Sequence, residues 1–177
     1  MRTIDPKTCT LLVVDFQARL MPAIQDAASV LTNARRLLDA AALLGIPTLF
    51  TEQNAKGLGP TVEELTPSEG STAHKMTFDA CRSDGFLDRL ANRPDVVVAG
   101  CEAHVCVLQT VLGLIDAGRH VFLARDALGA RRAENKETAI RRMERHGAEI
   151  VTTEMVVFEW LGTAEHPRFR EAVALVK

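Results

Sequence analysis

Cys106 is the residue of this chain best placed to act as a nucleophile. The segment 95–100 (DVVVAG) has the length of a buried strand, and the helical pattern after it puts Cys106 in the first turn of a helix. Unpaired backbone N–H groups and the positive end of the helix dipole favour a thiolate at such a position. Because the thiolate is the nucleophilic form, the sequence predicts covalent catalysis at Cys106, with a thiol that only packs in the core as the alternative.

Asp15 and Lys75 also come at the ends of strand-like segments, TLLVV and STAH. Asp15 is expected to take the thiol proton and return it to the leaving group, with Gln17 fixing the local loop; the alternative is a helix N-cap or a surface carboxylate at the end of a strand. A buried Lys75 needs an anionic partner, and Asp15 is the natural one. Lys75 would then stabilise developing negative charge, unless it is an ordinary solvated lysine.

The pattern of apolar residues predicts strands that alternate with helices. We expect strands at 10–15, 47–51, 71–75, 96–99, 120–124 and 149–152, and helices at 27–44, 83–90, 105–117, 134–146, 153–161 and 166–176. Ser83 is the expected N-cap of the second helix, and residues 54–70 are expected to form a long loop. This alternation predicts a single α/β domain over residues 1–177, a three-layer α-β-α sandwich with a mainly parallel six-stranded sheet.

Right-handed crossovers favour the strand order 3-2-1-4-5-6 for such a sheet. In that order strands 1 and 4 are neighbours, the chain reverses direction between them, and ligands bind at their carboxyl ends. Asp15 and Cys106 would therefore meet in one crevice although they are far apart in the sequence. Lys75, two strands away from the first strand, would reach the crevice with its long side chain.

Composition and charge argue against several classes of function. The 177 residues carry a net charge of −2, which gives no electrostatic reason to expect nucleic acid or an anionic membrane. No apolar run reaches the roughly 20 residues of a membrane span, and residues 1–10 lack an apolar signal core, so a cytoplasmic location is expected. The other cysteines, Cys9, Cys81 and Cys101, form no metal-ligand spacing with His or Cys and are expected to be core thiols.

Two groups of basic residues are expected to have roles other than catalysis. His104 could act as a base for Cys106, but side chains two residues apart do not face each other on a helix, so a supporting or interface role is expected. A basic cluster is interspersed with glutamates and is expected to be a solvated helix face. Its members are Arg131, Arg132, Arg141, Arg142 and Arg145.

Three motifs carry a resemblance to a known family: residues 12–17 (LVVDFQ), Lys75, and residues 100–107 (GCEAHVCV). In this order and spacing the chain resembles the isochorismatase-like cysteine hydrolases, in which the corresponding Asp, Lys and Cys form the catalytic triad. The resemblance implies that Asp15, Lys75 and Cys106 have these roles. It also implies a cis peptide at Cys101–Glu102, an oxyanion hole made by the backbone N–H groups of Glu102 and Cys106, and a homo-oligomer.

Two differences from other members of this family narrow the range of expected reactions. Nicotinamidases of this family carry an Asp-x-His…His metal site after the second strand, but residues 51–59 here (TEQNAKGLG) contain no histidine. We therefore expect no metal, no other cofactor and no nicotinamidase activity. Isochorismatases that cleave a vinyl ether lack the cysteine, so its presence argues against that reaction. The segment 51–60 most resembles a metal-free branch of isochorismatase-domain proteins.

The resulting hypothesis is hydrolysis of a C–N bond in a small, planar amide, ureide or carbamoyl compound through a thioester at Cys106. Gln53 and Phe78 are the expected substrate-binding residues. The alternative is a non-catalytic binding or scaffold protein that retains the fold, because fold alone does not establish activity.

Overall fold

The protein is built on one parallel β-sheet whose order, β3-β2-β1-β4-β5-β6, is the predicted one. The computed structural model describes residues 3–90 and 93–177. Every strand pair in the sheet is parallel. The strands are β1 (Cys9–Val14), β2 (Thr48–Gln53), β3 (Thr72–Lys75), β4 (Asp95–Cys101), β5 (His120–Gly129) and β6 (Glu149–Val151).

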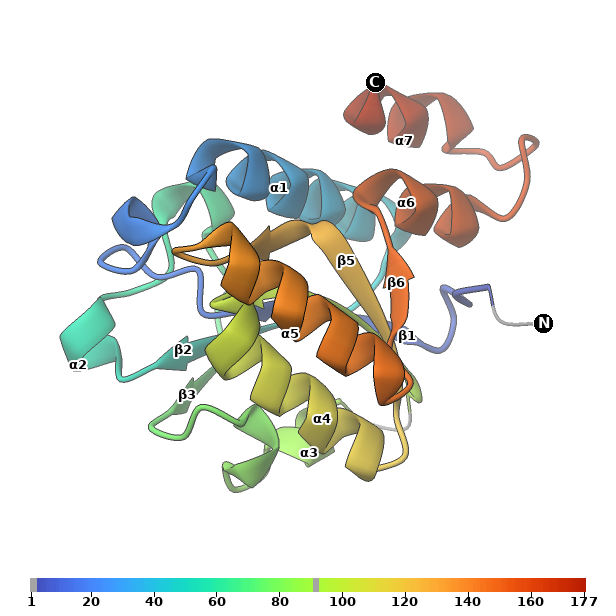
Figure 1. Cartoon of the computed structure of the whole chain (residues 1–177). Helices are drawn as coiled ribbons and strands as arrows, with labels where there is room; N and C mark the ends of the chain where they lie inside the picture. The colour runs from blue at the N-terminus through green and yellow to red at the C-terminus, as the bar shows by residue number, and fades with distance from the viewer. Residues whose placement is uncertain (1–2, 91–92) are drawn as a thin grey trace.

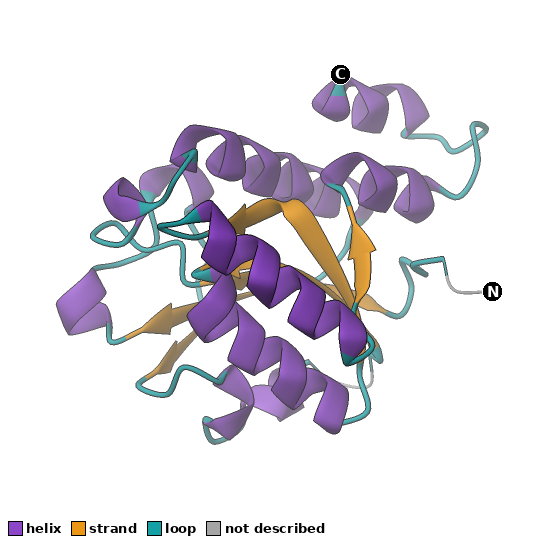
Figure 2. Cartoon of the chain, in the orientation of Figure 1, coloured by secondary structure: helices purple, strands orange, loops and turns teal. Residues whose placement is uncertain are grey.

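Helices cover both faces of the sheet, which gives the predicted three layers (Figures 1 and 2). One face is covered by α1 (Ala27–Leu44), α6 (Thr153–Leu161) and α7 (Phe169–Val176), and the other by α3 (Phe86–Arg89), α4 (Leu108–Asp116) and α5 (Ala133–Arg145). The short elements are α2 (Ala55–Leu58), the 3-10 turns η1 (Met21–Ala23), η2 (Glu63–Leu65) and η3 (Ala80–Arg82), and the π-helical turn η4 (Ala103–Val107). No helix in the described ranges is both long enough and apolar enough to cross a bilayer.

The central strands explain the uninterrupted apolar runs of the sequence. Every residue of β1 and of β4 is buried. Within β1, Leu11 and Val13 pack into the core under α1, whereas Leu12 and Val14 pack into the core under α4. A strand that is covered on both faces has no solvent side, so it does not need alternating polar residues.

Several boundaries differ from the prediction. The helix expected at 83–90 begins only at Phe86, because Gly85 takes a left-handed conformation (φ 71°) and serves as its N-cap in place of Ser83. Part of the expected loop 54–70 is helical, in α2 and η2. β5 runs on to Gly129 because its pairing with β4 changes register between Val98 and Gly100. Each of these features depends on local backbone geometry that hydrophobic periodicity does not report.

The end of β4 lies very close to β1, and only glycine fits there. A Cβ atom on Gly100 would lie 2.6 Å from both the Cβ and the carbonyl oxygen of Val14, and 3.1 Å from Val107 Cγ2. Since Val14 precedes Asp15 and Gly100 leads into the segment that carries Cys106, this contact sets how closely the two candidate residues approach.

We expect Gly100→Ala to lower the free energy of unfolding by about 1–3 kcal/mol, because the added methyl group overpacks a contact made with backbone. Urea unfolding measures the change. Gly57→Ala is the matched control, since a Cβ atom there meets the flexible end of the Asn54 side chain. The control should cost less than about 0.5 kcal/mol. Equal stabilities for the two variants would contradict the close approach of β4 to β1.

Candidate active site

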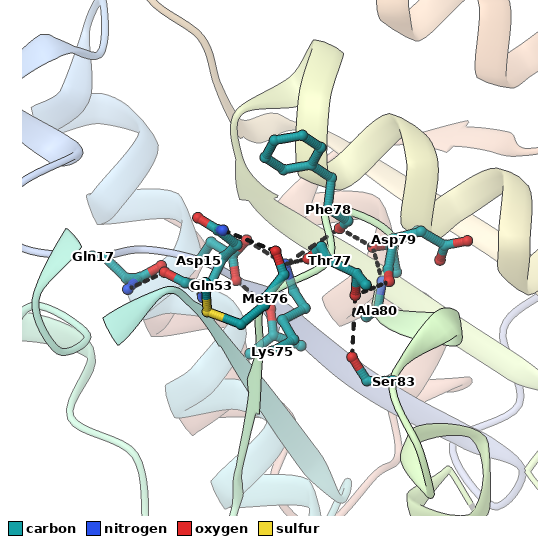
Figure 3. Close-up of polar contacts among 12 residues, drawn as sticks. Asp15, Gln17, Gln53, Lys75, Met76, Thr77, Phe78, Asp79, Ala80 and Ser83 are labelled. Atoms are coloured by element: carbon teal, nitrogen blue, oxygen red, sulfur yellow. Dashed lines mark hydrogen bonds and ion pairs between the residues drawn. The ribbon is translucent and has the colours of Figure 1, made fainter. Parts of the chain in front are cut away.

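Asp15 and Lys75 form a buried ion pair at the carboxyl edge of the sheet (Figure 3). Lys75 Nζ donates to Asp15 Oδ2 at 2.7 Å, and the two side chains are 1% and 0% exposed. The ammonium group also donates to the carbonyl oxygens of Thr77 at 3.3 Å and Phe78 at 3.2 Å. The lysine side chain thus reaches from β3, across the end of β2, to the residue that follows β1.

The other oxygen of Asp15 is held by β2. Thr51 Oγ1 donates to Asp15 Oδ1 at 2.6 Å, and the backbone N–H of Asp15 donates to the Thr51 carbonyl at 3.1 Å. Asp15 has a left-handed backbone conformation with φ 51°. Such a conformation is costly outside glycine and persists where surrounding contacts fix it. Both carboxylate oxygens of Asp15 are therefore held in fixed positions by hydrogen bonds.

Gln17 fixes the loop around Asp15, as predicted. Its Nε2 donates to the carbonyl oxygens of Gln53 at 3.0 Å and Gly59 at 2.7 Å, and its Oε1 accepts the backbone N–H of Gln53 at 2.9 Å. The side chain is fully buried. These bonds tie the end of β2 and the segment after α2 to the turn that carries Asp15.

Cys106 lies against this ion pair, within the π-helical turn η4. The residue is 6% exposed, and its thiol interacts with the side chains of both Asp15 and Lys75. Glu102 helps to shape the turn, because its carbonyl oxygen accepts the N–H groups of Val105 and Val107. The structure therefore brings Asp15, Lys75 and Cys106 together.

The expected lowering of the thiol pKa is wrong. Burial raises the pKa of Cys106 to about 12; the nearby Asp15 carboxylate also raises it, and Lys75 offsets part of this effect. The helix end favours the thiolate, but for a buried sulfur the loss of solvation is the larger effect and favours the neutral thiol. Cys106 is thus a neutral thiol near neutral pH, in contact with a carboxylate that can accept its proton.

The segment before Cys106 has the expected unusual backbone, since the Cys101–Glu102 peptide bond is cis. Glu102 and Cys106 both line a cavity of about 290 Å³. The oxyanion-hole role of their backbone N–H groups stays a prediction. His104, by contrast, faces α5, where its Nε2 lies 3.4 Å from Asn135 Nδ2.

The cavity contains both predicted substrate-binding residues, Gln53 and Phe78, and five residues that sequence reasoning missed. The missed residues are Leu20, Ala23, Leu58, Val105 and Arg131. All of them lie in segments that follow the carboxyl ends of β1, β2, β4 or β5. Their position after these strands was the available signal, because this edge of a parallel sheet is where ligands bind.

Arg131 corrects the interpretation of the basic cluster as a solvated helix face. It precedes α5, and its Nε and backbone N donate to Glu102 Oε2 at 2.9 and 3.2 Å. The prediction failed here because β5 is longer than expected and carries Arg131 to the edge of the sheet. Arg132, one residue later, does pair with the exposed Glu134 at 3.7 Å, as expected for a helix surface.

Within residues 3–90 and 93–177, no three His, Cys, Asp or Glu side chains are grouped closely enough to hold a metal ion. Glu52 follows Thr51 in the segment where nicotinamidases carry their metal ligands. Its carboxylate is buried and accepts the backbone N–H and Oγ1–H of Thr61 at 2.7 and 2.8 Å. Here the acidic side chain holds the loop that borders the cavity.

Comparison with known proteins agrees with this geometry. A family model described as "Isochorismatase domain" matches residues 9–155. The chain belongs to the isochorismatase family. Isochorismatase domain-containing protein 2 of Danio rerio is 34% identical over 176 residues, which cover 98% of this chain and 89% of that protein.

Solved structures of isochorismatase-like proteins extend the comparison. A structure described as the MAR1 ribonuclease of Caenorhabditis elegans is 35% identical, with a TM-score of 0.93 over 99% of this chain and 92% of the other. The YcaC protein of Escherichia coli, described as an octameric hydrolase of unknown specificity, is 25% identical. Its TM-score is 0.87 over 98% of this chain and 86% of the other. Family and fold thus place the chain among isochorismatase-like hydrolases.

We expect Asp15→Asn and Lys75→Met each to lower the free energy of unfolding by about 3–5 kcal/mol, because each leaves one buried charge without its partner. The double variant removes both charges. Its effect should be smaller than the sum of the single effects by at least about 2 kcal/mol. Urea unfolding of the four proteins gives the coupling; strictly additive losses would contradict a direct buried pair.

Asp15→Asn should also lower the pKa of Cys106, because it removes the nearest negative charge while Lys75 remains. The pH midpoint of iodoacetamide alkylation at Cys106 should fall below the wild-type value of about 12. Peptide mass spectrometry between about pH 7 and pH 11 follows the alkylation of each cysteine separately; the rate at Cys106 should still be rising at the upper end of this range in the wild-type protein and should level off at lower pH in Asp15→Asn. Asp84→Asn, an exposed change outside the site, is the control. An unchanged or higher midpoint in Asp15→Asn would show that this carboxylate does not act on the thiol.

Proposed function

We propose that this isochorismatase-family protein is a cysteine hydrolase that cleaves a C–N bond in a small amide, ureide or carbamoyl compound. The observation that carries the proposal is the buried Asp15–Lys75 ion pair, whose side chains both interact with the thiol of Cys106. The arrangement offers a nucleophile, a proton acceptor and a fixed cation beside one cavity. The description of the E. coli relative as a hydrolase supports the same class of reaction.

In the proposed first half-reaction, Cys106 Sγ attacks the substrate carbonyl carbon as Asp15 accepts the thiol proton. This concerted transfer suits a thiol with a raised pKa, because no free thiolate has to accumulate. The backbone N–H groups of Glu102 and Cys106 would stabilise the oxyanion. Asp15 then gives its proton to the leaving nitrogen, the C–N bond breaks, and ammonia or an amine departs from a thioester.

In the second half-reaction, water attacks the thioester carbonyl while Asp15 accepts a proton from the water. The C–S bond breaks, the proton returns to sulfur, and the carboxylic acid leaves. Lys75 stays paired with Asp15 and balances the negative charge that moves among carboxylate, sulfur and oxyanion. The net reaction consumes one water for each C–N bond, and the proposed mechanism uses no metal or other cofactor.

The cavity supports a small-molecule substrate. Its volume is about 290 Å³, and Leu20, Ala23, Leu58, Phe78 and Val105 make most of its wall apolar. A polynucleotide would require a basic surface that tracks its phosphates, whereas the chain has a net charge of −2. We therefore favour a small amide over RNA, although a relative is described as a ribonuclease.

We also propose that the protein works as a homo-oligomer. The E. coli relative is described as octameric. Beside the cavity, Met76 is 71% exposed and Phe78 is 49% exposed, although both are large apolar side chains. Burial of these side chains against another copy would remove apolar surface from water.

A panel of small amides, ureides and carbamoyl compounds, read by ammonia release, tests the proposed activity. For the best substrate, Cys106→Ala should lower kcat/KM by on the order of 10⁴-fold or more, because the nucleophile is lost. Cys81→Ala is the matched control and should retain wild-type turnover. Turnover at the wild-type rate by Cys106→Ala would refute the mechanism.

Two other results of the same panel would point to other functions. Ammonia release from no compound, together with no selective alkylation of Cys106, would favour a binding or scaffold protein that retains the fold. Cleavage of RNA that is lost in Cys106→Ala, with no amide hydrolysed, would replace the small-molecule proposal.

A further inference from the structure

The cavity contains a cation that the proposed reaction does not use. Arg131 lines the same cavity as Cys106, and its side chain is 59% exposed. The Arg131 side chain is therefore accessible to a ligand that enters the cavity. Lys75, the other cation of the site, is buried and already donates to Asp15 and to two carbonyl groups.

Glu102 holds the Arg131 guanidinium from one side. Glu102 Oε2 accepts the Arg131 Nε–H at 2.9 Å and the Arg131 backbone N–H at 3.2 Å. Within the described ranges, neither Nη1 nor Nη2 of Arg131 makes a hydrogen bond to another residue. The end of the guanidinium thus keeps two parallel donor directions, which match the two oxygens of a carboxylate.

The charged groups of the site pair with one another. The Asp15 carboxylate is paired with Lys75, and the Glu102 carboxylate, whose side chain is 8% exposed, is paired with Arg131. The cavity therefore has no net charge, and only directed donors can distinguish an anionic ligand from a neutral one. The wall of the same cavity includes apolar Val105 and Ala23, which suits a short hydrocarbon spacer.

We propose that the substrate carries a carboxylate a few atoms from the scissile C–N bond, and that Nη1 and Nη2 of Arg131 bind this carboxylate. This inference rests on the proposed amide hydrolysis and narrows it to small acids that bear an amide or ureide group. Arg131 would bind and orient the remote end of the substrate while Cys106 attacks its carbonyl carbon. Glu102 acts as a positioning residue, because it holds the guanidinium from behind.

The first experiment compares succinamate with butyramide, which has a methyl group in place of the carboxylate. The wild-type protein should prefer succinamate in kcat/KM. Arg131→Gln should lower the succinamate-to-butyramide ratio by on the order of 10²-fold, and Arg131→Lys by about 10-fold, because lysine keeps the charge but not the paired donors. Arg132→Gln, next in the chain and paired with Glu134, should leave the ratio unchanged.

Two outcomes of this comparison would overturn the inference. A wild-type preference for butyramide would show that the cavity rejects carboxylates. Equal losses on both compounds in Arg131→Gln would show that Arg131 serves only to hold Glu102 in place.

A second experiment separates this inference from the proposed hydrolysis, because it needs no turnover. Succinate should protect Cys106 from iodoacetamide in the wild-type protein and in Arg132→Gln, but much less in Arg131→Gln, whereas 1,4-butanediol should protect all three equally weakly. Protection that depends on Arg131 without hydrolysis of any amide would keep the carboxylate site and refute the hydrolase proposal. Amide hydrolysis together with equal protection by succinate and 1,4-butanediol would keep the hydrolase proposal and refute the carboxylate site.

Discussion

The buried ion pair between Asp15 and Lys75 is the interaction on which the rest of the site depends. Burial of two charges costs solvation, and their mutual attraction repays it only when their remaining hydrogen-bonding groups are also satisfied. Here Thr51 satisfies Asp15 Oδ1, and the carbonyl groups of Thr77 and Phe78 satisfy Lys75. A buried ion pair adds little net stability to a fold. Next to Cys106, however, the pair can take part in chemistry, because the Asp15 carboxylate can accept the thiol proton without the help of solvent.

The strand order is what makes this pair possible. β2 lies between β3 and β1, so Lys75 must cross the end of β2 to reach Asp15, and Thr51 of β2 meets the same carboxylate. β4 lies on the other side of β1, and the close contact between Gly100 and Val14 brings the turn with Cys106 to that point. Residues from four separate parts of the chain thus share one site because parallel strands end at the same edge.

The fold was predictable because its signals are strong: apolar runs such as 10–14 are typical of strands buried on both faces, as in a parallel sheet, and right-handed crossovers restrict the order. That strand order also predicts that Asp15, Lys75 and Cys106 meet at one edge of the sheet. The raised pKa of Cys106 was not predicted, because the effect of a helix end does not include the solvation lost on burial. Arg131 was missed because a change of register in β5, which no periodicity reveals, moves it to the cavity. Features that depend on local backbone geometry leave no mark on the periodicity of apolar residues.

The most direct test of the account is to trap the covalent intermediate. During turnover of its best small amide, the protein is quenched in acid and digested, and the peptide that contains Cys106 is weighed. We expect this peptide to gain the mass of the substrate's acyl group, and hydroxylamine at neutral pH to remove that mass, as for a thioester. Steady ammonia release with no acyl group on Cys106, or with the acyl group on another residue, would contradict the account.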